Sequence, residues 1–169
     1  VFHDALVHPQ TLALAVRAEK IAVGKRCGRQ STAQRFINKR LVDAAAKHAV
    51  VVRLKGGDPM LFGRAQEEID ALEAAGVAYE VVPGVTAALA AAAQIGTSLT
   101  QRGSVRAVTF ATPRVGEGED ASRWHAAFSA ADAGAIYMGM QEAPAIAQAL
   151  IAAGRAPATP VAIVENASL

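Results

Sequence analysis

The sequence predicts an α/β protein with two domains, each built on a mainly parallel sheet. Short apolar, β-branched runs alternate with helical patterns of about 10 to 18 residues, which is typical of βαβ units. A glycine-rich turn directly follows the most β-branched run, as at the ligand-binding edge of open α/β sheets. A second alternating series begins just after residue 100, so we place the domains at residues 1–100 and 101–169.

The first domain is predicted to alternate four strands with four helices. The strands are expected at residues 1–2, 21–23, 50–54 and 79–82. The helices are expected at residues 11–19, after Ser31, at 64–76 and at 86–95. The second of these helices places Ile37 and Leu41 on one apolar face, and Gly76 is predicted to end the third.

The second domain is predicted from a shorter alternating series. Strands are expected at residues 105–110, 135–138 and 161–164, and helices at 121–130 and 142–153. Strands and helices again alternate singly, which favours a parallel sheet over hairpins.

The loop Lys55-Gly56-Gly57-Asp58-Pro59 is the main candidate for a ligand site. It follows the run at 50–54, which has the pattern of a strand buried on both faces of a sheet. Glycine has no Cβ, so a ligand can approach the backbone closely and a positive φ costs little. The alternative is a tight turn that binds nothing.

Asp4 and Lys25 are a candidate acid–base pair. Each follows an apolar run that is expected to be a strand, so in a parallel sheet both would emerge at the carboxyl edge beside the glycine loop. A carboxylate and an amine placed there are suited to moving protons. The residues alone favour the alternative, a surface ion pair that contributes about 0–1 kcal/mol.

Composition argues against several classes of protein. The net charge is +2 and aromatic residues make up 5% of the chain, which disfavours a nucleic-acid surface. No apolar stretch approaches the roughly 20 residues that span a bilayer, and no signal peptide is visible, so we expect a cytoplasmic protein with no membrane partner. Cys27 is the only cysteine and the four histidines show no ligand spacing, so no metal site is expected.

One further motif is weak. Residues 116–121 match the outline G-x-G-x-x-A of a dinucleotide-binding turn. Three carboxylates lie within it and would repel a pyrophosphate, so a surface loop is the better interpretation.

Several stretches, in order along nearly the whole chain, resemble a known family. They are FHDALVHP, VGKRCGR, VVRLKGGDPMLFGR, VVPGVTAALAAAA, SLTQR, IYMGM and TPVAIVENAS. Together they are similar to the uroporphyrinogen-III C-methyltransferases of the tetrapyrrole methylase superfamily. The resemblance implies two α/β domains of the class III methyltransferase type, with S-adenosylmethionine in the cleft between them and a homodimer as the assembly.

The resemblance also implies an activity, which is two successive C-methylations of uroporphyrinogen III to precorrin-2, with S-adenosylhomocysteine as the other product. Asp4 matches a proton acceptor and Lys25 a proton donor of the family. The positions that match cofactor contacts are Gly56, Gly57, Asp58, Leu61, Thr86, Ala87, Met138 and Ala167. Arg53, Arg64 and Arg102 are candidates for binding the substrate carboxylates.

The chain departs from the family pattern in three ways. The family's first strand and its Gly-x-Gly-Pro-Gly loop have no counterpart, so we expect the protein to extend upstream of Val1. The family's Leu-Thr-His-Arg is replaced by a sequence with Gln101, and its Thr-Gly-His by one with Pro113. The last strands of the second domain are also absent from the sequence given.

Two other functions remain open at this point. One is a sister methylase that acts on another corrin intermediate, on diphthamide precursors or on ribosomal RNA. The other is a non-catalytic module that binds a nucleotide without turnover.

Overall fold

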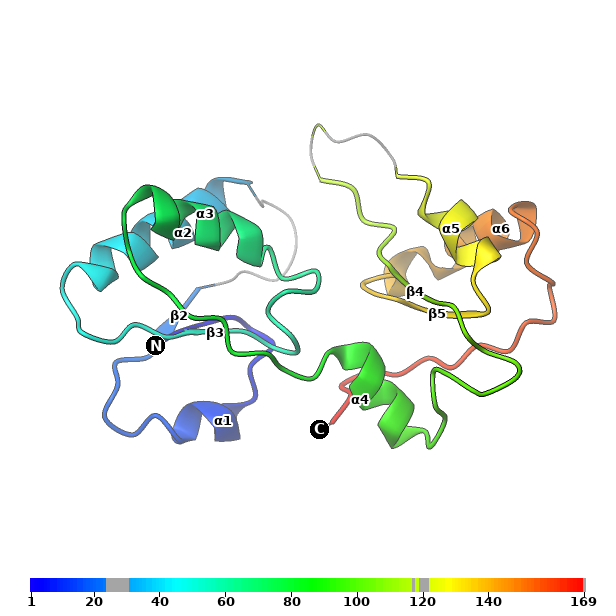
Figure 1. Cartoon of the computed structure of the whole chain (residues 1–169), viewed down its shortest axis with the longest axis horizontal. Coiled ribbons are helices and arrows are strands. Elements are labelled where there is room, and N and C mark those ends of the chain that lie inside the picture. Colours follow the sequence, from blue (N-terminus) through cyan, green and yellow to red (C-terminus); the bar gives the residue numbers. More distant parts are fainter. Residues whose placement is uncertain (24–30, 117, 119–121, 169) are drawn as a thin grey trace. The chain divides into compact units, whose positions relative to one another are not determined.

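The computed structural model describes residues 1–23, 31–116, 118 and 122–168, and for residues 31–33 the backbone alone. The chain divides into two compact units, Val1–Thr86 and Ala87–Leu169 (Figure 1). The predicted domain boundary near residue 100 falls within the second unit, and the two domains stay a proposal.

The first unit contains a three-stranded parallel sheet. Its order is β2 (Ile21–Ala22), β1 (Phe2–His3) and β3 (Arg53–Leu54). The helices α2 (Ser31–Ala45) and α3 (Ala65–Ala74) lie together on one side of this sheet, and α1 (Pro9–Ala13) lies on the other side (Figure 1).

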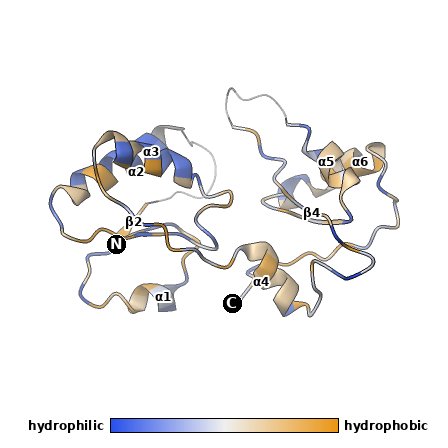
Figure 2. Cartoon of the chain, viewed as in Figure 1, coloured by the Kyte–Doolittle hydropathy of each residue, from blue (hydrophilic) through white to orange (hydrophobic). Residues whose placement is uncertain are grey.

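The core of this unit lies between the sheet and α2. The exposed fractions of Phe2 and Leu41 are 4% and 3%, and Val23 and Ile37 complete the buried cluster. Burying a side chain of this size contributes about 1.5–3 kcal/mol. In Figure 2 both hydrophilic and hydrophobic stretches are present along α2 and α3, as expected for helices with one buried side.

The second unit is built on two parallel strands, β4 (Val108–Ala111) and β5 (Ala133–Ile136). Its helices are α4 (Ala87–Gln94), α5 (Trp124–Ala130), the short 3₁₀ helix η1 (Met140–Glu142) and α6 (Ala143–Ala152). Phe128 of α5 is buried directly against β5, since a Cβ atom on Gly134 would lie 2.5 Å from its ring.

Several predictions from the sequence are confirmed. Both sheets are parallel, and helices connect their strands. Ile37 and Leu41 are the buried face of α2, and α3 ends before Gly76, which has φ = 66°.

Two predicted strands are absent from the structure and a third is much shorter, while those expected at 105–110 and 135–138 are found at Val108–Ala111 and Ala133–Ile136. Residues 79–82 and 161–164 form no strand, and the run at 50–54 is a strand only over Arg53–Leu54. Val50 is 79% exposed, so the burial on both faces that was expected for the run at 50–54 is wrong, and Val82 and Val161 are also exposed, at 73% and 81%. β-branched runs favour strands, but a strand forms only where a neighbour bonds its backbone, and β3 is at an edge of the described sheet.

The first predicted helix is also shorter than expected. Its N-cap is His8, whose Nδ1 accepts a hydrogen bond from the N–H of Gln10, and it ends after one turn. No helix in the described part of the chain is long and apolar enough to cross a membrane.

Candidate functional site

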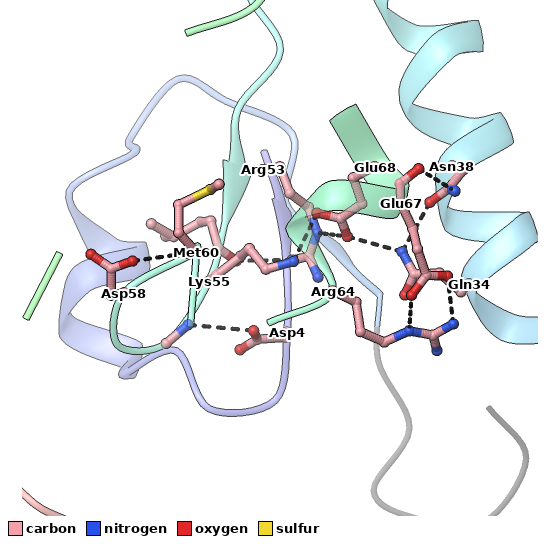
Figure 3. A network of polar contacts seen from close by, with 12 residues as sticks. Asp4, Gln34, Asn38, Arg53, Lys55, Asp58, Met60, Arg64, Glu67 and Glu68 are labelled. Carbon is pink, nitrogen blue, oxygen red and sulfur yellow. Dashed lines mark hydrogen bonds and ion pairs between the residues drawn. The ribbon is translucent and has the colours of Figure 1, made fainter. Parts of the chain in front are cut away.

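A carboxylate joins two strands at the carboxyl edge of the first sheet. Asp4 directly follows the last residue of β1, and Gly56 follows the last residue of β3 with Lys55 between them. The Oδ1 atom of Asp4 accepts a hydrogen bond from the N–H of Leu6 at 2.9 Å, and its Oδ2 atom accepts one from the N–H of Gly56 at 3.3 Å (Figure 3). The prediction that Asp4 lies beside the glycine loop is therefore confirmed, while its role stays a prediction.

A second carboxylate joins the glycine loop to the segment that leads into α4. The Oδ1 atom of Asp58 accepts from the N–H of Met60 at 2.8 Å, and its Oδ2 atom accepts from the N–H of Gly84 at 3.0 Å. The backbones also touch, because a Cβ atom on Gly84 would lie 2.4 Å from the carbonyl oxygen of Gly57. Only glycine fits at this position.

The glycine loop has the backbone conformation that its sequence requires. Gly57 has φ = 75°, in the left-handed region that glycine adopts at little cost. A Cβ atom on Gly56 would lie 2.8 Å from the Cβ of Leu6. We call Asp4, Gly56, Gly57, Asp58 and Gly84 the loop junction, since three chain segments meet there within hydrogen-bond or van der Waals contact.

Left-handed backbone continues beyond the loop junction. Leu61 is half-buried, and its N–H donates to the carbonyl oxygen of Asp58 at 3.4 Å. Phe62 and Arg64 have φ of 53° and 54°. Such conformations cost a bulky residue about 1–3 kcal/mol and are concentrated at functional sites, so they support a binding role for this loop.

The remaining predicted cofactor positions lie at or near the ends of α4 in the sequence or in space. Thr86, the last residue of the first unit, is 8% exposed, and α4 begins at Ala87. The N–H of Ala88 donates to the hydroxyl of Tyr137 at 3.0 Å, which brings the start of α4 close to the residue before Met138. Met138 is 50% exposed and has φ = 58°.

Ala167 lies near the other end of the same helix. Its neighbours Asn166 and Ser168 have φ of 54° and 70°. The N–H of Ser168 donates to the Oε1 atom of Gln94, the last residue of α4, at 3.2 Å. Ala87 thus begins α4, the residue before Met138 contacts the start of this helix, and the residue after Ala167 contacts its last residue. Met138 itself and both neighbours of Ala167 have left-handed backbone.

Other predicted residues are placed differently or lie outside the described residues. Lys25 and most of the motif at 116–121 fall outside them. The Arg53 side chain donates to Glu68 and the Arg64 side chain to Glu67, so both guanidinium groups have an internal carboxylate partner. Arg102 is exposed.

Sequence reasoning missed two residues of this region. Gly84 is not among the residues that the sequence singles out, although its contact with Gly57 is the tightest in the loop junction. Glu68, in the first turn of α3, is not among them either, whereas it is buried and bonded to Lys55, the first residue of the glycine loop. A useful signal was the pair Arg53 and Lys55, two cations beside a strand end that require an internal anion if they are buried.

Comparison with known proteins places this geometry in a family. The sequence matches the Tetrapyrrole (Corrin/Porphyrin) Methylases over residues 1–169. The siroheme synthase of Psychrobacter sp. (strain PRwf-1) is 44% identical across 100% of this chain and 35% of the relative. Siroheme synthase 1 of Yersinia pseudotuberculosis is 47% identical across 97% of this chain and 35% of the relative. The chain thus spans about a third of the length of these curated relatives.

Solved structures agree with this assignment. The uroporphyrin-III C-methyl transferase of Thermus thermophilus complexed with S-adenyl homocysteine has a TM-score of 0.76 and 38% identity, over 92% of this chain and 65% of that one. The cobalt precorrin-4 methyltransferase, with a TM-score of 0.71 and 22% identity, shares the fold. With the match over its whole length, the chain belongs to the tetrapyrrole (corrin/porphyrin) methylase family.

Proposed function

We propose that this chain is the methyltransferase part of a protein that methylates uroporphyrinogen III twice at carbon and forms precorrin-2. It uses S-adenosylmethionine and releases S-adenosylhomocysteine, in the biosynthesis of sirohaem and cobalamin. The observation that carries the proposal is the loop junction at the carboxyl edge of a parallel sheet, in a chain similar to siroheme synthases. A related structure holds S-adenyl homocysteine, which supports the cofactor.

The residues present fit such a cofactor. Gly57 is exposed with a positive φ, so a ligand can approach its backbone, and half-buried Leu61 offers an apolar surface nearby. The N–H groups at the start of α4, apart from that of Ala88, which donates to Tyr137, suit the carboxylate of the methionine part. We propose that Met138 and Ala167 complete the site, which lies in a cleft between domains 1–100 and 101–169 of a cytoplasmic homodimer.

The bound cofactor would supply a methyl group already activated by the sulfonium. The chain then has to bind the tetrapyrrole, align its carbon and exclude water. We propose that Asp4 accepts the proton that leaves the substrate and that Lys25 donates one. The Asp4 carboxylate can take this role while holding Leu6 and Gly56, because two carboxylate oxygens together offer about four lone-pair sites.

Methyl transfer to a defined substrate tests the proposed function. The full-length protein containing this chain is incubated with methyl-labelled S-adenosylmethionine and uroporphyrinogen III. We expect the tetrapyrrole to gain two labelled methyl groups. Binding of the cofactor without transfer would indicate a non-catalytic module, and transfer only to another corrinoid or to RNA would indicate a sister methylase.

The proton-transfer roles have a separate test. General acid–base assistance contributes about 10²–10⁴-fold, so Asp4→Asn and Lys25→Met should each lower kcat at least about tenfold. Lys25→Met should change S-adenosylhomocysteine affinity little, whereas Asp4→Asn leaves one acceptor for the N–H groups of Leu6 and Gly56 and should lower this affinity by roughly two- to tenfold. Saturating cofactor separates that loss from the loss of kcat. Wild-type turnover in both variants would instead support a surface ion pair.

A further inference from the structure

We propose that Glu68 is the positioning residue of the glycine loop, and that it acts by neutralising the buried side chain of Lys55, the residue directly before Gly56–Asp58. The inference rests on the proposed function, since it assigns Glu68 a part in holding the same cofactor site. It concerns a side chain of α3 that does not belong to the loop junction.

The carboxylate of Glu68 is the centre of a polar cluster. Its Oε2 atom accepts from Nζ of Lys55 at 2.8 Å. Its Oε1 atom accepts from Nε of Arg53 at 3.0 Å and from Nε2 of Gln34 at 3.1 Å (Figure 3). One anion from α3 therefore serves two cations from the end of β3 and an amide from α2.

Burial makes this anion necessary. The side chains of Lys55 and Glu68 are each 7% exposed, and that of Arg53 is 15% exposed. A buried cation is tolerated when an anion pairs with it, and removing one partner leaves the other charge uncompensated. Without Glu68, Lys55 and Arg53 would repel each other in the interior.

Lys55 transmits this constraint to the loop. It directly precedes Gly56, whose N–H is held by Asp4. A Cβ atom on Gly63 would lie 3.1 Å from Cε of Lys55 and 2.7 Å from the carbonyl oxygen of Pro59. The backbone at Gly63, beyond Pro59, thus packs on the aliphatic stem of Lys55. A Lys55 side chain that swings out to solvent therefore leaves both Gly56 and Gly63 without this support.

The charge state of Lys55 gives the inference a specific signature. Burial lowers the pKa of Lys55, while the hydrogen bond and charge of Glu68 oppose that shift. Arg53 on β3 lowers this pKa further and Asp4 after β1 raises it. The pKa of Glu67 on α3 is lowered mainly by its hydrogen bond with Arg64 and to a smaller extent by the charge of Lys55. Loss of the Glu68 charge should therefore bring the lysine titration closer to neutral pH.

The experiment compares neighbouring glutamates in the full-length protein. Glu68→Gln keeps the shape and one acceptor but removes the charge, and calorimetric titration should show S-adenosylhomocysteine binding weakened at least about tenfold at neutral pH. The loss should shrink as pH rises, because a deprotonated Lys55 no longer needs an anion. Glu67→Gln is the matched control: it breaks an exposed pair with Arg64, so binding should stay within about twofold at every pH.

A rescue variant separates positioning from general stabilisation. Met has no charge to neutralise, so Lys55→Met combined with Glu68→Gln should recover part of the affinity lost in the single variant, while Arg53 still lacks its anion. This double variant also carries the test if Glu68→Gln does not fold. Failure of the double variant to fold or to bind would overturn the inference, as would a pH-independent loss in the single variant.

Amide hydrogen exchange distinguishes this inference from the proposed function. Glu68→Gln should speed exchange in peptides covering residues 55–63, and Glu67→Gln should not. If the wild-type protein does not bind S-adenosylhomocysteine but the exchange difference is present, the proposed function fails and the positioning of the loop by Glu68 stands. Unchanged exchange and unchanged binding in Glu68→Gln would refute the positioning role.

Discussion

Each unit uses an aspartate to join neighbouring strands through backbone N–H groups, but the two aspartates lie at opposite edges of their sheets. In the first unit Asp4 follows β1 and holds Gly56 after β3, at the carboxyl edge. In the second unit Asp132 precedes β5, and its Oδ2 atom accepts from the N–H groups of Arg106 and Ala107 before β4, at 2.8 and 2.9 Å. An aspartate that accepts backbone N–H groups thus lies at the carboxyl end of one parallel strand pair and at the amino end of the other.

The difference teaches where to look for function. Ligands of open α/β sheets bind beyond the carboxyl ends of the strands, where loops can vary without disturbing the sheet. The amino edge of the second unit is instead closed by structural contacts. Arg155 donates to the carbonyl oxygens of Phe128 and Ala131 there, at 2.7 and 2.6 Å. We therefore expect changes around Asp4 to affect binding or turnover, and changes around Asp132 to affect stability.

A pair of glycines gives the largest expected contrast. A Cβ atom at Gly84 would meet the Gly57 carbonyl oxygen at 2.4 Å, so Gly84→Ala should push the two loops apart and weaken S-adenosylhomocysteine binding at least tenfold, about 1.4 kcal/mol. Gly134→Ala would meet the Phe128 ring at 2.5 Å and should cost about 1–3 kcal/mol of stability without changing affinity. Calorimetric titration and thermal unfolding of both variants measure this contrast, and equal losses of affinity would break it.

A smaller effect is expected at the second carboxylate of the loop junction. Asp58→Asn leaves one acceptor for the N–H groups of Met60 and Gly84, so about one hydrogen bond worth 0.5–1.5 kcal/mol is lost. S-adenosylhomocysteine affinity should fall by roughly two- to tenfold. Calorimetric titration of both variants with S-adenosylhomocysteine sharpens the comparison. A larger loss of affinity in Asp58→Asn than in Gly84→Ala would indicate direct contact between Asp58 and the ligand.

The smallest effect is expected at Asp132, and it depends on pH. The hydrogen bond from the backbone N–H of Ala107, and to a smaller extent that from Arg106, lowers the pKa of Asp132 below its ordinary value of 3.8. A carboxyl group whose pKa is lowered by folding stabilises the protein above the unfolded pKa, and this stabilisation is lost as pH falls through the folded pKa. Asp132→Asn should therefore lower Tm slightly at neutral pH, and the difference from wild type should vanish in strong acid. A constant difference across the pH range would contradict this explanation.

The sequence predicted well what depends on neighbours along the chain. The helices α2 and α3 follow from apolar periodicity, and the end of α3 at Gly76 follows from its preference for left-handed backbone. The position of Asp4 beside Gly56 follows from parallel topology alone, because the carboxyl ends of parallel strands share one edge.

What depends on distant contacts was not predictable. The valines of residues 79–82 and 161–164 have strand propensity, but the described residues supply no bonded neighbour strand. The requirement for glycine at position 84 comes from Gly57, which is far away in the sequence. The burial of Glu68 likewise depends on cations from β3, and helix periodicity does not reveal them.

Single-turnover methylation by two aspartate variants tests the central claim most directly. The full-length wild-type protein, Asp4→Asn and Asp132→Asn are each mixed with saturating methyl-labelled S-adenosylmethionine and uroporphyrinogen III. We predict transfer by the wild type, transfer at least about tenfold slower in Asp4→Asn, and a wild-type rate in Asp132→Asn. Equal rates in the two variants, or no transfer by the wild type, would contradict the assignment of the active site to the carboxyl edge of the first sheet.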